Sequence, residues 1–294
     1  MNEDSHIYKA CKRCYDITTR YLNLEDKTEI IKDTKLKLQT CLDLFTETIL
    51  ERWTPFVDDD DFQKHYLSIS YNGGKDCQVL MIVYLASIFK KYEHQIQYKD
   101  VKIPAVYLKT YDNFPELIGF IKESKKLYEL DLYVTNINEM VDTLNEYLDS
   151  RHSRHNENIG ILLGTRQTDA VNYKMEAIQP TDKNYPKFIR IQPILSWSLR
   201  NVWSFLLFSK EPHCSLYDVG YTSLGKPSET VANPWLFNES TNPNINNRNL
   251  FENERDGVKD LTDCVCLPGW FLIDDMKERD GRNCIVKRKK SEQE

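Results

Sequence analysis

Residues 70–76 (SYNGGKD) hold the residue types that bind phosphate groups. Two adjacent glycines let the backbone come close to a ligand, and free N–H groups at a helix start attract phosphate. Lys75 adds positive charge, and the Asp76 carboxylate is suited to Mg²⁺ beside a phosphate. The segment is not a Walker A loop, because Ile69 and Asp76 stand where that motif has its first Gly and its Ser/Thr. The plain alternative is a Gly-Gly turn in which Asp76 only favours a helix N-terminus.

The segments around this loop alternate between the hydrophobic pattern of a strand and that of a helix. Residues 65–70 (HYLSIS) predict a strand before the loop, and apolar periodicity over residues 76–92 predicts a helix after it. Further strands are expected at 103–108, 131–134, 159–163 and 188–192, and further helices at 115–128, 137–150 and 199–210. Strands separated by helices predict βαβ units. The predicted fold class is therefore α/β, a mostly parallel twisted Rossmann-like sheet flanked by helices.

The two ends of the chain differ from this pattern. Apolar spacings of three and four over residues 27–53 predict helix, and the acidic run 58–61 predicts a solvated loop. Residues 238–249 (NESTNPNINNRN) are rich in Asn, which is typical of a surface loop or flap. We expect an N-terminal helical extension at residues 1–55, a catalytic core at 56–235 and a C-terminal flap at 236–294.

Composition excludes several classes of protein. The 294 residues carry 39 Lys plus Arg against 45 Asp plus Glu, a net charge of −6, with 40% hydrophobic residues. A nucleic acid or an anionic membrane surface would favour net positive charge, so we expect neither as a partner. The longest apolar run, residues 79–89, is too short to span a bilayer, and the N-terminus has no apolar signal core. A cytoplasmic protein is expected, with a monomer as the default.

The eight cysteines have two interpretations. Cys11 and Cys14 have the spacing of zinc ligands, but Cys264 and Cys266 are one residue closer than the usual second pair. Disulfide frameworks belong to small secreted domains, which this chain does not resemble. Reduced thiols are the favoured interpretation.

Four segments, in order, resemble those of one superfamily of enzymes. The SYNGGKDC loop is similar to the phosphate loop of adenine-nucleotide α-hydrolases, which cleave ATP between the α and β phosphates. Three more segments resemble those of phosphoadenylyl-sulfate reductases, namely YLKTYDNFPE at 107–116, RIQPILSWSLRNVW at 190–203 and LYDVGYTSLG at 216–225.

Departures from the reductase pattern indicate a different member. None of the cysteines stands in the Glu-Cys-Gly-x-His motif that a reductase needs. The loop form NGGKDC, the segment GTRQTD at 164–169 and the tail RDGR at 279–282 instead resemble the eukaryotic FAD synthetase family, over roughly residues 60–285. The resemblance implies an FMN adenylyltransferase that makes FAD and pyrophosphate from FMN and ATP, with Mg²⁺.

The resemblance also implies roles for individual residues on the ATP side. Asn72, Asp76 and Asp169 are the expected catalytic residues, with Asp76 and Asp169 as metal ligands. Phosphate and adenine contacts are expected from residues at the carboxyl ends of strands, where ligands of open α/β sheets bind. These are Ser70, Gly73, Gly74, Lys75, Tyr107, Leu108, Gly164 and Arg166. Two plain alternatives stay open, in which Gly164 only ends a strand and Asp169 caps a helix.

The flavin side is assigned from the remaining matches. The candidates are Asp112, Phe114, Glu116, Thr181, Asp182, Lys183, Asn184, Arg190, Trp197, Arg279 and Arg282. Phe114 is equally suited to a hydrophobic contact at a helix entry, Trp197 to the core, and the two tail arginines to a solvated end. Two other functions stay open. One is another adenylyl-transferring or sulfonucleotide-binding member of the superfamily, and the other is a nucleotide-binding regulator without turnover.

Overall fold

The chain forms two compact units, Met1–His213 and Cys214–Glu294. The computed structural model describes residues 4–56, 65–97, 101–137, 139–150, 159–169, 174–237 and 266–282. The expected boundary at residue 235 does not coincide with the division between the units, and the N-terminal helices share a unit with the sheet. The three-part functional division stays a prediction. The acidic run 58–61 and the Asn-rich segment 238–249 lie outside the described residues.

The first unit is built on a mostly parallel sheet, as predicted. Its described strands are β1 (Trp53–Thr54), β2 (His65–Ser70), β3 (Ile103–Tyr107), β4 (Leu130–Val134), β5 (Gly160–Leu162), β6 (Ile178–Pro180) and β7 (Ile189–Ile191). They run in the order β4-β3-β2-β5-β7-β6, with β1 also paired to β2. Among these described strands, only the β6–β7 pairing is antiparallel. β1 and β6 were not predicted, because two or three residues are too few to show a strand period.

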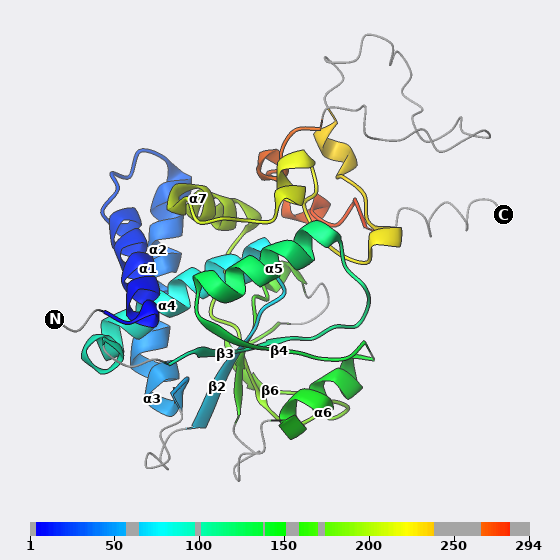
Figure 1. Cartoon of the computed structure of the whole chain (residues 1–294). Helices are drawn as coiled ribbons and strands as arrows, with labels where there is room; N and C mark the ends of the chain where they lie inside the picture. Colours follow the sequence, from blue (N-terminus) through cyan, green and yellow to red (C-terminus); the bar gives the residue numbers. More distant parts are fainter. Residues whose placement is uncertain are drawn as a thin grey trace, which may run out of the picture. The chain divides into compact units, whose positions relative to one another are not determined.

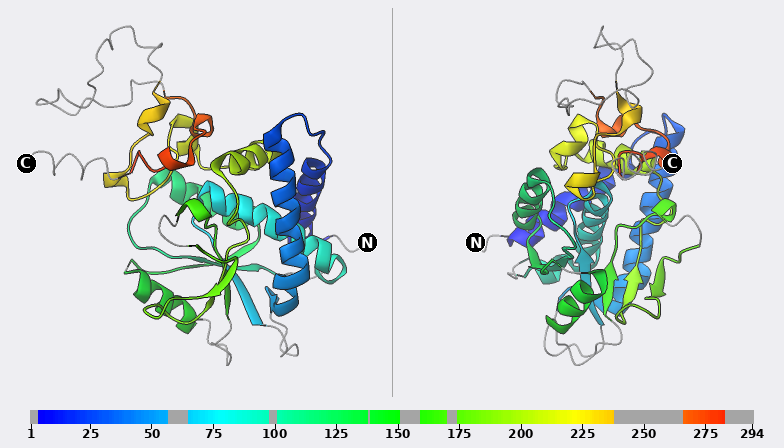
Figure 2. Two further views of the ribbon diagram at one scale, coloured as in Figure 1. Left: turned by 180° about the vertical axis from the view of Figure 1, so that it is seen from behind. Right: turned by 90° about the vertical axis from the view of Figure 1, so that its right-hand side faces the viewer.

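The helices of this unit confirm the predicted ones within a few residues at each end. They are α1 (His6–Leu22), α2 (Glu29–Leu44), α3 (Leu50–Arg52), α4 (Lys75–Ile96), α5 (Pro115–Leu127), α6 (Met140–Ser150) and α7 (Leu199–Ser209), and a π-helical turn (Phe45–Ile49) joins α2 to α3. Figure 1 shows α4 to α6 packed around the strands, and Figure 2 shows α1 and α2 running beside α4. The predicted helix over 27–53 is thus interrupted by the π turn.

The long apolar run on α4 lies in the core of this unit. Every residue from Val79 to Phe89 is buried, which explains why the segment is apolar on all sides rather than on one face. In the part of the chain that the structure describes, no helix is both long enough and apolar enough to cross a bilayer.

α6 covers the face of the sheet on which Ser68 lies. The hydroxyl groups of Tyr147 on α6 and Ser68 on β2 are 2.6 Å apart, both in the interior. Around them lies an apolar cluster from α6 and the neighbouring strands, which comprises Val106, Leu144, Tyr147, Leu148, Ile159, Ile161 and Phe188. Burial of this size is the main force that holds a helix on a sheet.

The described part of the second unit consists of short 3₁₀ turns held by side-chain-to-backbone hydrogen bonds. Thr222 Oγ1 donates to the carbonyl of Glu278 at 2.7 Å, and Asn233 Nδ2 donates to that of Lys277 at 2.8 Å. The backbone N–H of Val231 donates to the carbonyl of Gly281 at 2.9 Å. The C-terminal segment 266–282 is therefore bound to residues 222–233 of the same unit.

Candidate functional site

The strand order predicts a crevice at the carboxyl ends of β2 and β5. From β2 the chain continues outward through β3 to β4, then returns to place β5 on the other side of β2. Ligands of open α/β sheets bind where the direction of winding changes in this way. The loop after β2 carries residues 71–74 and the loop after β5 carries residues 163–166, so the two predicted phosphate-binding segments meet at this point.

The loop after β2 has a conformation that requires its first glycine. Gly73 has a φ of +72°, and a Cβ there would lie 2.8 Å from the side chain of Ile121 on α5. Asn72 Oδ1 accepts a hydrogen bond from the N–H of Gly74 at 2.9 Å, which closes the turn. Gly74 is the residue before α4 and has no side chain to cap it. The N-terminus of α4 therefore has no capping side chain from Gly74, an arrangement that favours an anion at that end.

Lys75, Asp76 and Arg166 form a buried charge cluster across the two loops. Lys75 Nζ lies 3.0 Å from Asp76 Oδ2, and Arg166 Nε lies 2.8 Å from Asp76 Oδ1. The side chains of Lys75 and Arg166 are 2% and 1% exposed. Burial alone would raise the pKa of Asp76, but the two cations outweigh it and hold that pKa below its ordinary value. The cluster brings two positive side chains and one carboxylate to the crevice.

The loop after β5 passes very close to the start of α4. A Cβ at Gly164 would lie 2.9 Å from both the backbone nitrogen and the sulfur of Cys77, so only glycine fits without movement. Asp169 Oδ2 accepts a hydrogen bond from the N–H of Arg166 at 2.8 Å. Asp169, the last residue of the 3₁₀ turn Gln167–Asp169, thus stabilises the turn that follows Arg166, and it does not cap the start of a helix as the plain alternative expected.

The carboxylates near the crevice limit how Mg²⁺ would be held. Among the described residues there is no group of three or more His, Cys, Asp or Glu side chains that would form a metal centre. Mg²⁺ commonly takes one or two carboxylates together with substrate phosphates, so Asp76 alone is an adequate protein ligand. In this structure both Asp76 oxygens are engaged by Lys75 and Arg166. The donor set fits Mg²⁺ when phosphates take over those two cations.

β3 brings further predicted residues to the same edge of the sheet. Tyr107 is buried, and its hydroxyl accepts a hydrogen bond from Asn113. Leu108, directly after the strand, is half-buried. Asp112 is 85% exposed and pairs with Lys109 at 3.1 Å. Of the remaining candidates here, Phe114 is half-buried directly before α5, and Glu116 is exposed in its first turn.

The candidates at 181–184 and 190 lie on the β6–β7 hairpin. Arg190 Nη2 lies 3.2 Å from Asp182 Oδ1 across the hairpin, and Thr181 Oγ1 donates to the carbonyl of Pro186 at 2.8 Å. Asp182, Lys183 and Asn184 are exposed. The adjacent Tyr185, 42% exposed, is an accessible aromatic ring that its polar neighbours in the sequence do not indicate.

Trp197 does not lie in the crevice as a free ring. It is 2% exposed and packs edge-on against Phe205 at 6.0 Å between ring centroids. The structure assigns it to the core, the alternative left open from the sequence, because its indole is enclosed by its own unit. Its expected contact with a ligand ring is not supported.

Arg279 and Arg282 belong to the second unit. Arg279 is exposed. The guanidinium of Arg282 lies against Gly225, where a Cβ would come within 2.5 Å of Nη2, and its backbone pairs with that of Thr230. Arg282 is thus anchored within its unit rather than part of a solvated tail.

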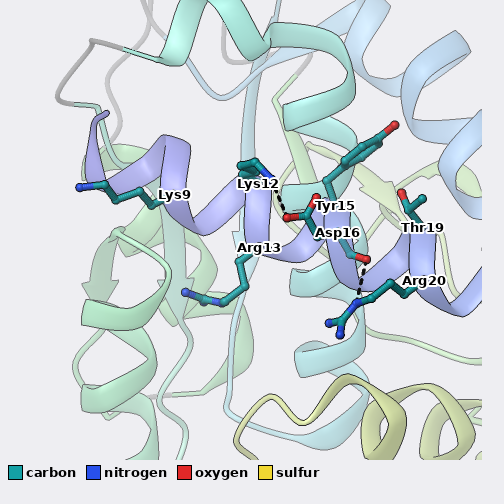
Figure 3. Close-up of a pocket in the computed structure, with 7 residues that line it drawn as sticks. All are labelled: Lys9, Lys12, Arg13, Tyr15, Asp16, Thr19 and Arg20. Atoms are coloured by element: carbon teal, nitrogen blue, oxygen red, sulfur yellow. Dashed lines mark hydrogen bonds and ion pairs between the residues drawn. The ribbon is translucent and has the colours of Figure 1, made fainter. Parts of the chain in front are cut away.

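The cysteines and the surface hollow beside α1 do not add to this site. Cys11 and Cys14 are buried and free, and Cys264, which belongs to the disfavoured zinc alternative, lies outside the described residues. A hollow of about 650 Å³ is lined by residues of α1, namely Lys9, Lys12, Arg13, Tyr15, Asp16, Thr19 and Arg20 (Figure 3). It contains none of the predicted site residues.

Comparisons with known proteins agree with this geometry. Residues 66–232 match the phosphoadenosine phosphosulfate reductase domain family. The flavin adenine dinucleotide synthase of Saccharomyces cerevisiae is 32% identical over 313 residues, which cover 94% of this chain and 98% of the relative. The probable FAD synthase of Schizosaccharomyces pombe is 36% identical over 77% of this chain and 75% of its own length.

Solved structures are similar over nearly the whole chain. Candida glabrata FMN adenylyltransferase in complex with FMN and the ATP analogue AMPCPP has a TM-score of 0.78 and 31% identity, covering 94% of this chain and 99% of that one. Yeast FAD synthetase in complex with FAD has a TM-score of 0.79 and 33% identity, with the same coverage.

Proposed function

This chain belongs to the FAD synthase family, whose members are also named FMN adenylyltransferases, and we propose that it makes FAD from FMN and ATP. The family expected from the sequence motifs is confirmed by the relatives and by the solved structures. The observation that carries the proposal is the meeting of Lys75, Asp76 and Arg166 in the crevice between β2 and β5.

The proposed reaction transfers the adenylyl group of ATP. An oxygen of the FMN phosphate attacks the α-phosphorus, a new P–O bond forms, and the bond between the α-phosphorus and the bridging oxygen breaks. Pyrophosphate leaves with that oxygen. The attacking phosphate is already ionised near neutral pH, so no general base is required. The protein has to align the two phosphates and neutralise their charge, which are the two contributions expected in phosphoryl-type transfers.

The residues of the crevice are suited to both contributions, the alignment of the phosphates and the neutralisation of their charge. The turn at residues 72–74 is shaped for phosphate oxygens, and the buried cations of Lys75 and Arg166 have no solvent to weaken their fields. We assign them to the triphosphate. When phosphates pair with these cations, the Asp76 carboxylate is released from them. Mg²⁺ bound there would neutralise further phosphate charge, with Asp169 as a second candidate ligand.

The flavin is assigned to the outer part of the same edge. Tyr107 and Leu108 are proposed for adenine, and the hairpin residues 181–184 with Arg190 are proposed for FMN. The exposed Tyr185 on that hairpin offers an aromatic face. Arg279 and Arg282 remain proposed contacts to FMN or pyrophosphate oxygens, supported by the anchoring of Arg282 on Gly225.

We further propose that the protein is a cytoplasmic monomer. Four of the described cysteines, Cys11, Cys14, Cys41 and Cys77, are buried and in no disulfide, as expected in a reducing compartment. Sedimentation of the purified protein would test the monomer, and a larger species would contradict it.

One incubation tests the proposed function. Purified protein is mixed with FMN, ATP and Mg²⁺, and FAD and pyrophosphate are followed by chromatography. Equal amounts of both products are expected. No FAD above a control without protein would overturn the proposal. Replacing FMN with other phosphate or sulfate acceptors in parallel distinguishes a different adenylyl transfer from an inactive nucleotide-binding protein.

A further inference from the structure

A chain of buried hydrogen bonds begins at Tyr71, the residue directly before the phosphate-binding turn. The Tyr71 hydroxyl lies 2.6 Å from Gln78 Oε1 on α4 and 2.9 Å from Ser124 Oγ on α5. The backbone N–H of Tyr71 also donates to the carbonyl of Val106 on β3, at 2.8 Å. Tyr71 therefore attaches the start of the turn to two helices and a strand.

The series of hydrogen bonds continues from Tyr71 through Gln78 to the carboxylate of Glu211. Gln78 Nε2 donates one hydrogen to the hydroxyl of Tyr128 and the other to the carbonyl of Pro212. Tyr128 Oη donates to Glu211 Oε2 at 2.7 Å. A carboxylate only accepts hydrogen bonds, so Glu211 sets the direction of the bonds from Tyr128 back to Gln78. Both amide hydrogens of Gln78 are used, which fixes its orientation.

Arg13 on α1 completes the chain at its far end. Its Nε and Nη2 lie 2.9 Å and 3.3 Å from the two carboxylate oxygens of Glu211. Nη2 also lies 3.5 Å from the carbonyl of Leu127, the last residue of α5, and the guanidinium carbon is 5.7 Å from the centroid of the Tyr128 ring. One arginine thus neutralises Glu211 and supports the C-terminal end of α5.

Burial makes the inner members of this hydrogen-bond series sensitive to the loss of a partner, whereas the Arg13 side chain, at the outer end, is 37% exposed. Tyr71, Gln78, Ser124 and Tyr128 are essentially inaccessible, and Glu211 is 8% exposed. Burial, followed by the Glu211 charge, raises the pKa of Tyr128 well above its ordinary value, so its hydroxyl stays protonated. Removing one partner leaves a buried polar group unsatisfied, and the neighbouring elements shift to satisfy it.

We propose that Arg13 and Glu211 are positioning residues for ATP, which act on the phosphate-binding turn through Tyr128, Gln78 and Tyr71. The N-terminal helix thereby has a role in nucleotide binding although it contributes no contact to the crevice. α5 carries the effect twice, because it holds Ser124 beside Tyr71 and also supplies the Ile121 side chain against which Gly73 rests. This inference rests on the proposed function, because it assumes that the turn at residues 72–74 binds ATP.

α1 itself offers a matched control. Lys12 is adjacent to Arg13 but pairs with Asp16 on the solvent side of the helix, at 2.7 Å (Figure 3). Lys12→Met and Arg13→Met each remove one positive charge from the same turn. Only the second removes a partner of the buried chain.

The test measures the dissociation constant for ATP by calorimetry, without FMN. Arg13→Met is expected to raise it about three- to tenfold, and Lys12→Met to leave it within about twofold. The double variant R13M/E211Q should recover part of the loss, because a neutral amide accepts from Tyr128 without needing a cation. Tyr71→Phe should also weaken ATP binding. In the double variant R13M/Y71F the dissociation constant should rise by less than the product of the two single increases.

If Arg13 had only a structural role, Arg13→Met would lower the melting temperature and leave the dissociation constant for ATP unchanged. An ATP constant within twofold of wild type in Arg13→Met, or in Tyr71→Phe if the former cannot be purified, would overturn the proposal. So would strict additivity of the two variants. The measurement needs no turnover, so wild-type protein that binds ATP but forms no FAD would overturn the proposed function alone.

Discussion

Arg166 Nε lies 2.8 Å from Asp76 Oδ1, although the two residues are separated by ninety positions along the chain. The pair joins the loop after β5 to the first turn of α4, and Lys75 pairs with the other carboxylate oxygen at 3.0 Å. Asp76 thus compensates two buried cations that are proposed to bind phosphate. A triphosphate bound there would exchange one anionic partner of these cations for another, which reduces the reorganisation needed on binding.

Replacing Asp76 should remove most of the activity. Asp76→Asn keeps the size of the side chain but removes the charge that the cations and Mg²⁺ require, so we expect kcat to fall about 100-fold or more. Steady-state FAD formation measures it, with circular dichroism to confirm folding. Asp16→Asn, on the surface of α1, is the control and should change kcat by less than twofold. A kcat near wild type in Asp76→Asn would remove Asp76 from the reaction.

The same carboxylate should make stability depend on pH. The pKa of Asp76 is lowered in the folded state, so its ionised form stabilises the protein at every pH above the ordinary Asp value of about 4. That stabilisation is lost as the pH falls through the lowered, folded-state pKa. In urea unfolding, the free energy of unfolding of the wild type should therefore exceed that of Asp76→Asn by an amount that is constant near neutrality and shrinks below about pH 4. An advantage that does not change with pH would contradict the ion pairing.

Gly73 and Gly119 offer a matched pair of glycine substitutions. Ala at Gly73 must adopt a φ of +72° and meets Ile121 at 2.8 Å, so we expect about 1–3 kcal/mol of lost stability and weaker ATP binding. Ala at Gly119, on α5, meets nothing within 4 Å and should add about 0.5–1 kcal/mol. Chemical denaturation of both variants tests this. Equal effects of the two substitutions would rule out the strained turn.

Cys77 should be unreactive in the folded protein. Burial raises the pKa of its thiol to about 11, so roughly one molecule in a thousand carries the thiolate at pH 8. Iodoacetamide at pH 8, followed by peptide mass spectrometry, should label the partly exposed Cys266 and leave Cys77 unmodified until the protein is denatured. Rapid labelling of Cys77 in native protein would show that the start of α4 opens freely.

Replacing Arg282 should change the binding of FMN or the release of pyrophosphate more than the binding of ATP. Arg282→Ala is expected to raise the KM for FMN or lower kcat several-fold with little change in ATP binding, as the proposed phosphate contact requires. Lys226→Ala, which removes a surface partner of Glu229, is the control. Unchanged FMN kinetics in Arg282→Ala would leave Arg282 with a structural role only.

Much of the architecture was predictable because it depends on local patterns. The strand at 65–70, the helix after it and the alternation that follows were expected from periodicity, and the structure confirms them. The glycine pair before Lys75 indicated the turn that is proposed to bind phosphate, because few other residues permit that backbone approach. The family, and with it the reaction, also followed from short motifs that keep their order along the chain.

Other features depend on distances that the linear sequence does not contain. The pairing of Asp76 with Arg166, the placement of Trp197 in the core and the hydrogen bonds from Arg13 to Tyr71 each join segments far apart in the chain. Glu211 and Arg13 look like ordinary surface charges in the sequence. Only the packing of α1 and α7 against α4 makes them partners, and the burial of Glu211 turns a common ion pair into one that must be satisfied. The sequence by itself thus determined the family, the mostly parallel sheet and the glycine turn after β2, and the tertiary structure decided which distant side chains hold that turn in place.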